Sequence, residues 1–224
     1  MFINEVRLNK RWWIAPIIFY GFIFFLLLNK LTLPKEIGIL MYTLGGIVVL
    51  LCEFGWNNVK KMFKAPAWNI VYKVPLAIIS CLIISSLTML LGKLFQVQDY
   101  KSNLGLSNLD DQNSTNIIKI FLTSWIQLIG EELITAIICL PILIILKRFL
   151  PWKLSLCLAI LISSLIFGLL HIETYQYHFY QALIVIGMIR IPFTYLWFNT
   201  NTLWGGIIAH ICFDYLLIVS IIMT

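Results

Sequence analysis

Long apolar runs separated by short polar segments dominate the pattern of this chain. A run of about 20 apolar residues is long enough to cross the hydrocarbon core of a bilayer as a helix. The pattern predicts seven spans: Trp12–Leu28, Ile37–Phe54, Val74–Leu94, Ile117–Leu146, Leu154–His171, Tyr177–Phe198 and Leu203–Met223. We therefore expect an all-α fold, a polytopic transmembrane helical bundle of about seven spans (six to eight).

The composition agrees with a membrane protein and excludes an ordinary soluble domain. Hydrophobic residues make up 61% of the 224 residues and charged residues only 12%, whereas a soluble domain is about half apolar and one quarter charged. No hydrophilic block is large enough to fold separately, so residues 1–224 are expected to form a single membrane-embedded domain. Five cysteines lie singly in apolar runs without any CxxC pair, which is typical of buried structural thiols.

The net charge of +6 would raise the question of nucleic acid in a soluble protein. In a membrane protein, basic loops set the topology and contact anionic lipid, so the bilayer is the expected partner and nucleic acid is not. Three basic clusters fall on one side if the spans alternate: Arg7, Lys10 and Arg11; Lys60, Lys61, Lys64 and Lys73; and Lys147, Arg148 and Lys153. This bias predicts a multi-pass protein of a bacterial plasma membrane with its N-terminus in the cytoplasm.

The same alternation places the longest polar stretch, residues 96–116, outside the cell. The N-terminal apolar run follows positive residues, as in a signal peptide, but it is long enough to span and no small-residue cleavage site follows it. We interpret this run as a retained first helix.

Six ionisable residues lie inside the predicted spans, where charged groups are costly and usually functional. They are Glu131, Glu132, His171, Arg190, His210 and Asp214. They belong to four spans, and each would face lipid unless they converge. Carboxylates and imidazoles that meet in one pocket suggest hydrolysis or proton movement.

The spacing of these residues shows which of them share a helix face. Phe167 and His171 are four residues apart, as are His210 and Asp214, so each pair lies on one face. Glu131 and its neighbour Glu132 point about 100° apart, so one carboxylate can face a reaction centre while the other takes a structural partner. Each pattern alone also has a structural interpretation: a buried ion pair, an interfacial histidine or a helix-packing contact.

Taken in order, the motifs resemble those of the CAAX-protease and bacteriocin-processing (Abi) family of intramembrane endopeptidases. The matching segments are Glu131-Glu132, the FGLLH segment that ends at His171 and the HICFD segment that begins at His210. The resemblance covers about Ile117 to Leu217, which we take as the catalytic core. Each motif alone is weak, but the three together, each inside a span, are fairly specific.

One position departs from the family pattern. The first motif usually reads EExxxR, and the arginine position is Ala136 in this chain. We expect Arg190, a costly charge in the sixth span, to replace the missing arginine, with Glu132 or Asp214 as its partner. A loss of activity is the alternative.

The resemblance implies a mechanism for the catalytic residues. In the family, the first glutamate and the first motif histidine activate a water, so Glu131 and His171 would form the base pair. His210 would donate to the oxyanion and Asp214 would orient it, because an ionised aspartate only accepts hydrogen bonds. Glu132, Phe167 and Arg190 would support the site; these three are not assigned direct chemistry.

No cofactor is expected, because the family pattern indicates a glutamate-dependent hydrolase. The chain has no HExxH motif, and zinc held by Glu131, His171 and His210 is a minority possibility. Counting along straight helices puts His171 near the outer end of its span and His210 about two turns from the inner end of its own. These depths conflict with a shared site, which requires the two histidines to lie close together. Tilted helices, a deep cavity or a mistaken boundary would each reconcile the two positions.

The leading functional prediction is an intramembrane protease of a membrane-associated peptide or protein, with a bacteriocin or signalling-peptide precursor as substrate. A CAAX-type prenyl-protein endopeptidase is the first alternative. A non-catalytic immunity or scaffold protein is the second, and Ala136 favours it. A proton-coupled transporter is weaker, because the sequence has no repeated halves. The sequence leaves the cleaved bond, the side of substrate entry and the oligomeric state open.

Overall fold

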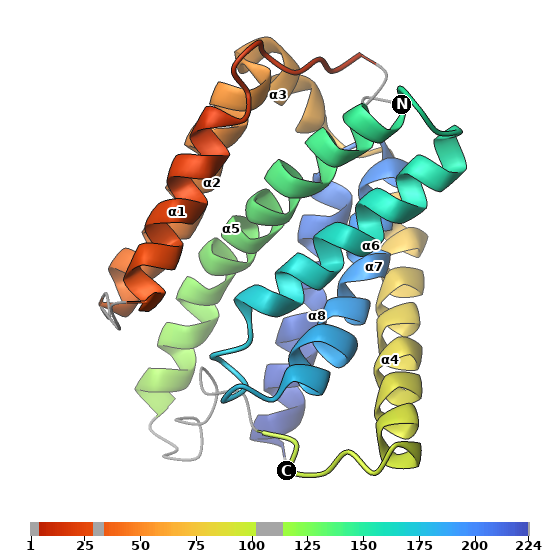
Figure 1. Cartoon of the computed structure of the whole chain (residues 1–224). Helices are drawn as coiled ribbons and strands as arrows, with labels where there is room; N and C mark the ends of the chain where they lie inside the picture. The colour runs from red at the N-terminus through yellow and green to blue at the C-terminus, as the bar shows by residue number, and fades with distance from the viewer. Residues whose placement is uncertain (1–4, 29–33, 102–113, 224) are drawn as a thin grey trace.

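The computed structural model describes residues 5–28, 34–101 and 114–223, and these residues form helices and no strand (Figure 1). The elements are α1 (Ile14–Leu28), α2 (Lys35–Phe54), α3 (Trp56–Met62), α4 (Ile70–Leu94), α5 (Ser114–Leu146), α6 (Trp152–Leu170), the π-helix η3 (Gln181–Ile186), α7 (Gly187–Thr200) and α8 (Trp204–Ile222). The predicted all-α fold is confirmed. Lys30 and most of the long polar stretch after α4 lie outside the described residues.

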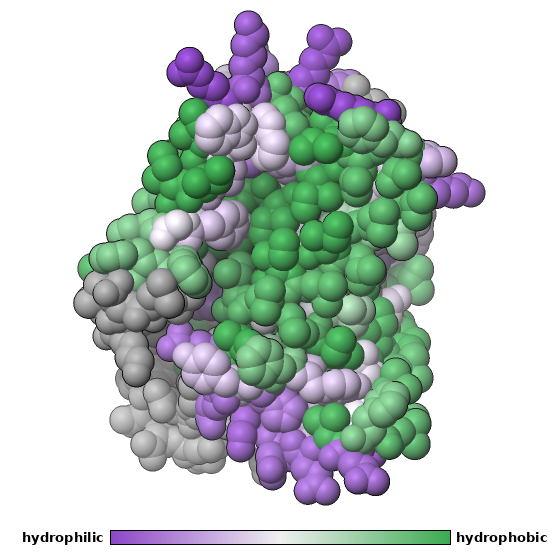
Figure 2. Space-filling model, viewed as in Figure 1, coloured by the Kyte–Doolittle hydropathy of each residue, from purple (hydrophilic) through white to green (hydrophobic). Residues whose placement is uncertain are grey.

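Seven of the helices are apolar enough to lie in a membrane. Five contain long apolar segments: Ile37–Phe54, Ile70–Leu94, Ile120–Leu146, Trp152–Leu170 and Gln181–Thr200. The segments Ile14–Leu26 and Trp204–Ser220 are shorter and equally apolar in character. The seven match the predicted spans one to one. Figure 2 shows a hydrophobic band between two hydrophilic ends, as expected for a bundle that crosses a bilayer.

Helix α3 lies at one end of the bundle and includes Lys60 and Lys61 of the second basic cluster (Figure 1). Its last residue, Met62, accepts hydrogen bonds from the Leu203 amide at 2.8 Å and from the Thr202 hydroxyl at 3.0 Å. Both Thr202 and Leu203 are 1% exposed. The second half of the turn between α7 and α8, Thr202 and Leu203, is therefore buried beneath α3, which places the start of α8 inward of the surface.

Helix α5 is central to the arrangement and packs against α2, α6 and α8. Helix α6 runs obliquely from the α3 end and stops partway down the molecule, short of the far end of α4 (Figure 1). At its last turn, a Cβ added to Gly168 would lie 2.5 Å from the Ala182 carbonyl oxygen in η3. This close approach brings the end of α6, and with it His171, against the helix that carries Arg190.

The main hydrophobic core lies between the site and α3. Its fully buried members include Leu50 of α2, Leu140 and Leu143 of α5, and Trp197 of α7. Because this core fills the α3 half of the bundle, any open space for a substrate has to lie in the other half.

Candidate active site

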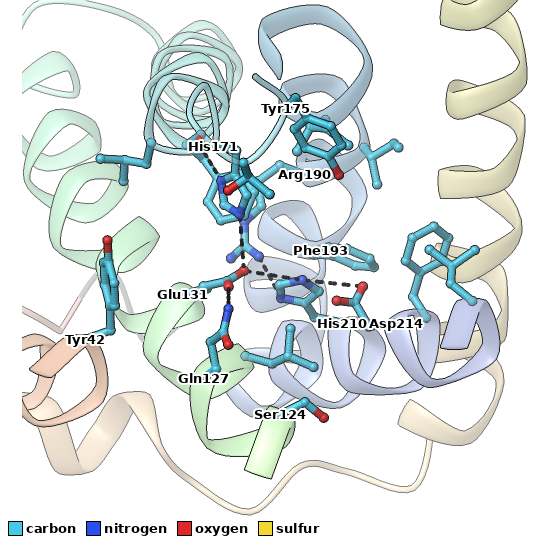
Figure 3. Close-up of a pocket in the computed structure, with 18 of the residues that line it drawn as sticks. Tyr42, Ser124, Gln127, Glu131, His171, Tyr175, Arg190, Phe193, His210 and Asp214 are labelled. Carbon is cyan, nitrogen blue, oxygen red and sulfur yellow. Dashed lines mark hydrogen bonds and ion pairs between the residues drawn. The ribbon is translucent and has the colours of Figure 1, made fainter. Parts of the chain in front are cut away.

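A cavity of about 740 Å³ lies among the helices, and five of the six predicted ionisable residues line it. Glu131, His171, Arg190, His210 and Asp214 reach it from α5, the end of α6, α7 and α8 (Figure 3). Phe167 also lines it, and Glu132 lies behind it in the protein interior. The structure therefore brings together all of the residues that the sequence singled out.

Glu131 stands between the two histidines. Its Oε2 atom lies 3.8 Å from His171 Nε2 and 3.9 Å from His210 Nε2, and its Oε1 atom accepts a hydrogen bond from Gln127 Nε2 at 2.9 Å. The side chain is 13% exposed. Separations near 4 Å are too long for direct hydrogen bonds and are suitable for a bridging water. The carboxylate is thus held on one side by Gln127 and open to a small polar molecule on the other.

A hydrogen bond to the backbone indicates which ring nitrogen of His171 carries the proton. Its Nδ1 atom lies 2.9 Å from the Phe167 carbonyl oxygen, one helical turn earlier. A carbonyl oxygen only accepts, so Nδ1 carries the proton and the Nε2 atom of the neutral ring is a free acceptor. Nε2 and Glu131 Oε2 are then two acceptors that face each other across 3.8 Å. A water that donates one hydrogen to each would satisfy both.

Glu132 is the most fully bonded carboxylate of the site. Its Oε1 atom lies 2.5 Å from Arg190 Nη1 and 3.0 Å from His210 Nδ1, and its Oε2 atom accepts from Trp197 Nε1 at 2.8 Å. Both Glu132 and Arg190 are 1% exposed. The sequence left the partner of Arg190 open between Glu132 and Asp214; the structure selects Glu132. This contact links α5 to α7 and α8.

Aromatic rings surround the guanidinium of Arg190. Its Cζ atom lies 4.8 Å from the ring centre of Phe167, 5.7 Å from that of Trp197 and 5.9 Å from that of Phe193. Such rings attract a desolvated cation through their negative faces. Phe167 therefore supports the site through Arg190 as well as through His171, whose ring centre is 4.3 Å away. The Arg190 Nε and Nη2 atoms have no hydrogen-bond partner among the described residues.

His210 is held on its Nδ1 side by the buried ion pair. Nδ1 lies 3.0 Å from Glu132 Oε1 and 3.1 Å from Arg190 Nη1, and the ring stacks on Phe193 with centres 5.0 Å apart. Nε2 points toward Glu131 and Asp214, which also line the cavity. The Asp214 Oδ1 atom is 3.8 Å from Nε2, beyond hydrogen-bonding distance. With the proton on Nδ1, the ring donates to Glu132 Oε1, and this hydrogen bond orients it while Arg190 lies beside the same nitrogen.

The apparent mismatch in depth between His171 and His210 has a structural cause. Helix α6 is oblique and ends partway down the bundle, so His171 is not at the outer surface (Figure 1). The buried α7–α8 turn lies inward of α3, so His210 is deeper than its position in α8 suggests. Tilt and a deep cavity together bring the two rings to the same carboxylate.

Three site residues were not predicted from the sequence. Gln127 is four residues before Glu131, and Trp197 is seven residues after Arg190, so helical spacing places both on the relevant faces. Tyr42 contributes a wall of the cavity from α2, and no local signal in α2 points to it. Among the described residues, no three His, Cys, Asp or Glu side chains are grouped so as to hold a metal ion.

Comparison with known protein families gives a match over part of the chain. Residues 113–216 match the family model described as "Type II CAAX prenyl endopeptidase Rce1-like". Neither the comparison with curated proteins nor the comparison with solved structures finds a match. The matched region contains Glu131, His171 and Asp214, and thus all three motifs. The match therefore agrees with the resemblance that the order of the motifs indicated, to the CAAX proteases.

Proposed function

We propose that the protein is an intramembrane endopeptidase in which Glu131 and His171 activate a water molecule. The observation that carries this proposal is the pair of facing acceptors, Glu131 Oε2 and His171 Nε2, separated by 3.8 Å in the wall of a cavity. A water held there has both hydrogens engaged, which turns an oxygen lone pair toward the cavity. A carboxylate and an imidazole at this distance are suitable for general-base catalysis.

The proposed reaction is the hydrolysis of one peptide bond. The water oxygen attacks the carbonyl carbon of the substrate while a proton of that water passes to Glu131. The carbon–nitrogen bond then breaks, and Glu131 returns the proton to the departing amine. The products are a carboxylic acid and an amine, so the step needs no oxidant or reductant. His171 orients the water throughout, because Nδ1 keeps its proton and donates it in a hydrogen bond to the Phe167 carbonyl oxygen, which leaves Nε2 as the acceptor.

We propose that His210 stabilises the oxyanion that develops on the substrate. A doubly protonated ring donates through Nδ1 to Glu132 and through Nε2 to the substrate oxygen, which is where negative charge appears. Asp214 lies beside the same Nε2 atom and is placed to balance the charge of the ring. An ionised aspartate cannot itself donate to the oxyanion. Its role is therefore to support His210.

The Arg190–Glu132 contact bears on whether the site is active. Ala136 at the arginine position of the first motif favours an immunity or scaffold protein without catalysis. The buried carboxylate nevertheless has an arginine partner, supplied by α7 instead of by the motif itself. This replacement supports an intact site and makes the non-catalytic alternative the weaker one.

The substrate that we propose is a membrane-associated peptide, such as a bacteriocin or signalling-peptide precursor. A prenylated CAAX protein is the second candidate, because the matched family model carries that activity in its description. Purified protein would be incubated with candidate precursors encoded near its gene and with a farnesylated CAAX peptide. Mass spectrometry would report the cleaved bond, and the peptide that is cleaved would decide between the two substrates.

The test of mechanism compares Glu131→Gln with Glu5→Gln. Glu5 lies 3.5 Å from Lys61 with its side chain 55% exposed, far from the cavity, so its replacement is a matched control. We expect cleavage to be lost in Glu131→Gln and kept in Glu5→Gln, with activity insensitive to a metal chelator. Cleavage by Glu131→Gln at the wild-type rate would refute the assigned base. Loss of wild-type activity on chelation, with recovery on added zinc, would instead support a zinc enzyme.

A further inference from the structure

Charged residues outside the spans are distributed unevenly between the two ends of the bundle. The end that carries α3 has ten basic residues: Arg7, Lys10, Arg11, Lys60, Lys61, Lys64, Lys73, Lys147, Arg148 and Lys153. The acidic residue Glu5 joins them there. At the opposite end, the described residues carry charges of both signs: Lys93 is at the end of α4, and Asp99, Lys101 and Glu173 are in the loops. By the positive-inside rule, the α3 end faces the cytoplasm.

The cavity occupies the other half of the bundle. Its inner end is lined by the buried residues Arg190, Phe193 and His210; the first two lie near the middle of the apolar segment Gln181–Thr200 and the third in the first half of α8. Towards the end away from α3, the lining continues to Glu173, which is exposed, and to Leu217, which is 40% exposed. The main hydrophobic core closes the α3 side. The cavity therefore has its floor at mid-depth and its mouth on the side opposite the basic clusters.

A polar track runs along α5 from this mouth to the proposed base. Ser124, Gln127 and Glu131 are spaced by three and four residues, so they share one helix face, and all three line the cavity (Figure 3). The hydroxyl oxygen of Ser124 is buried and has no hydrogen-bond partner among the described residues. Seven helical residues span about 10 Å, which is the length of about three residues of extended peptide.

The remaining walls are largely apolar, with Ile23, Leu82 and Val185 contributed by three different helices. A backbone laid along the α5 track would bond to Ser124 and Gln127 while its side chains entered these walls. A polar strip in an apolar cleft is suited to an extended, uncharged peptide segment. The described residues that line the mouth include no basic cluster, which agrees with a segment that carries no strong negative charge.

We infer that the site opens to the extracytoplasmic half of the membrane and takes an exported peptide, whose apolar segment enters from that side along α5. This inference rests on the proposed peptidase function and names its substrate class. In this orientation prenylated C-termini of cytoplasmic proteins are presented at the opposite surface, so the inference favours the exported peptide over the second candidate substrate. About three residues of the peptide lie between Ser124 and the cleaved bond.

Cysteine accessibility tests the orientation without requiring cleavage. The five native cysteines would be replaced, and single cysteines introduced as Glu173→Cys at the mouth, Ser124→Cys in the track and Asn57→Cys on exposed α3. A membrane-impermeant sulfonated maleimide is added to intact cells or to lysed cells. We expect Glu173→Cys and Ser124→Cys to react in intact cells, and Asn57→Cys to react only after lysis.

A second measurement uses the otherwise unchanged chain, in case the cysteine-free protein does not fold. An epitope tag at the N-terminus should be protected from external protease in intact cells, and a tag at the C-terminus should be digested, because seven spans separate them. Reaction of Asn57→Cys in intact cells would overturn the inference, as would digestion of the N-terminal tag. Neither readout depends on catalysis, so the orientation can fail while the peptidase function stands.

The substrate class is tested with single-span reporters that carry the segment cleaved by the purified enzyme. One reporter places this segment outside the cell and the other places it in the cytoplasm, with the same anchor sequence reversed. We expect cleavage of the external reporter alone, abolished by Glu131→Gln. Cleavage of the cytoplasmic reporter alone would overturn the inference and leave the peptidase intact. Failure of the purified enzyme to cleave any precursor would instead refute the proposed function.

Discussion

Replacing Arg190 by Met leaves the Glu132 carboxylate buried without its cation. Glu132 is 1% exposed, and it would retain the Trp197 indole at 2.8 Å and His210 Nδ1 at 3.0 Å. Removing one member of a buried ion pair typically costs about 3–5 kcal/mol. Because two donors remain on the carboxylate, we expect the lower end, about 3 kcal/mol. The Met side chain keeps apolar contact with Phe167, so the substitution leaves little unfilled space and loses little further free energy of unfolding.

A double-mutant cycle separates the ion pair from the other contacts. Glu132→Gln alone leaves the guanidinium of Arg190 buried without its carboxylate. The double variant, Arg190→Met with Glu132→Gln, buries neither charge. The double variant should therefore lose less stability than the sum of the single variants, by about 0.5–3 kcal/mol. Unfolding of detergent-solubilised protein, followed by tryptophan fluorescence, measures each value. A loss of 3 kcal/mol corresponds to a Tm lowered by about 6–12 °C.

The result that would refute this reasoning is additivity. If the two single losses sum to the double loss, Arg190 and Glu132 are not coupled, and the proposed replacement of the motif arginine is wrong. A Tm of Arg190→Met equal to that of the wild type would refute it as well.

Two further predictions concern the motif arginine and the packing of α6. Ala136→Arg in the Arg190→Ala background moves the cation to a position four residues from Glu132 on the same helix face. We expect about 1.5–3 kcal/mol of the lost stability to return. If the Tm does not recover, the idea that Arg190 replaces the motif arginine is contradicted. Gly168→Ala should cost about 1–3 kcal/mol and slow cleavage, because the added methyl would lie 2.5 Å from a carbonyl oxygen of η3. Gly21→Ala, which has open space around it, is the control and should leave Tm and cleavage unchanged.

The spans and the identity of the polar residues could be predicted from the sequence, because the cost of a charge in lipid does not depend on the fold. Arg190 had to meet an acid for this reason. Which acid it meets depends on how α7 is rotated against α5 and α8, and a single sequence does not encode that rotation in any local pattern. The choice of Glu132 over Asp214 therefore came only with the structure.

The depth of the site residues in the bilayer was the other property that could not be predicted by counting residues along the helices. Counting assumes straight helices of equal height, whereas α6 is oblique and the α7–α8 turn is buried under α3 (Figure 1). The π-helix η3 likewise has no recognisable sequence signal before Gly187. Trp197 was missed for a different reason: a tryptophan in an apolar span is common, and only its contact with Glu132 distinguishes it.

The buried pair also has a consequence for how the chain enters the membrane during synthesis. Glu132 lies in α5, and its partner Arg190 follows 58 residues later, in α7. When α5 is inserted, two adjacent acids enter the bilayer before any described arginine or histidine of the site has been made. A single such acid at mid-membrane costs about 2.5–3.5 kcal/mol on insertion scales. Helix α5 is therefore expected to stay beside the insertion machinery until α7 and α8 arrive, and a chain that stops after α6 should be retained there or degraded.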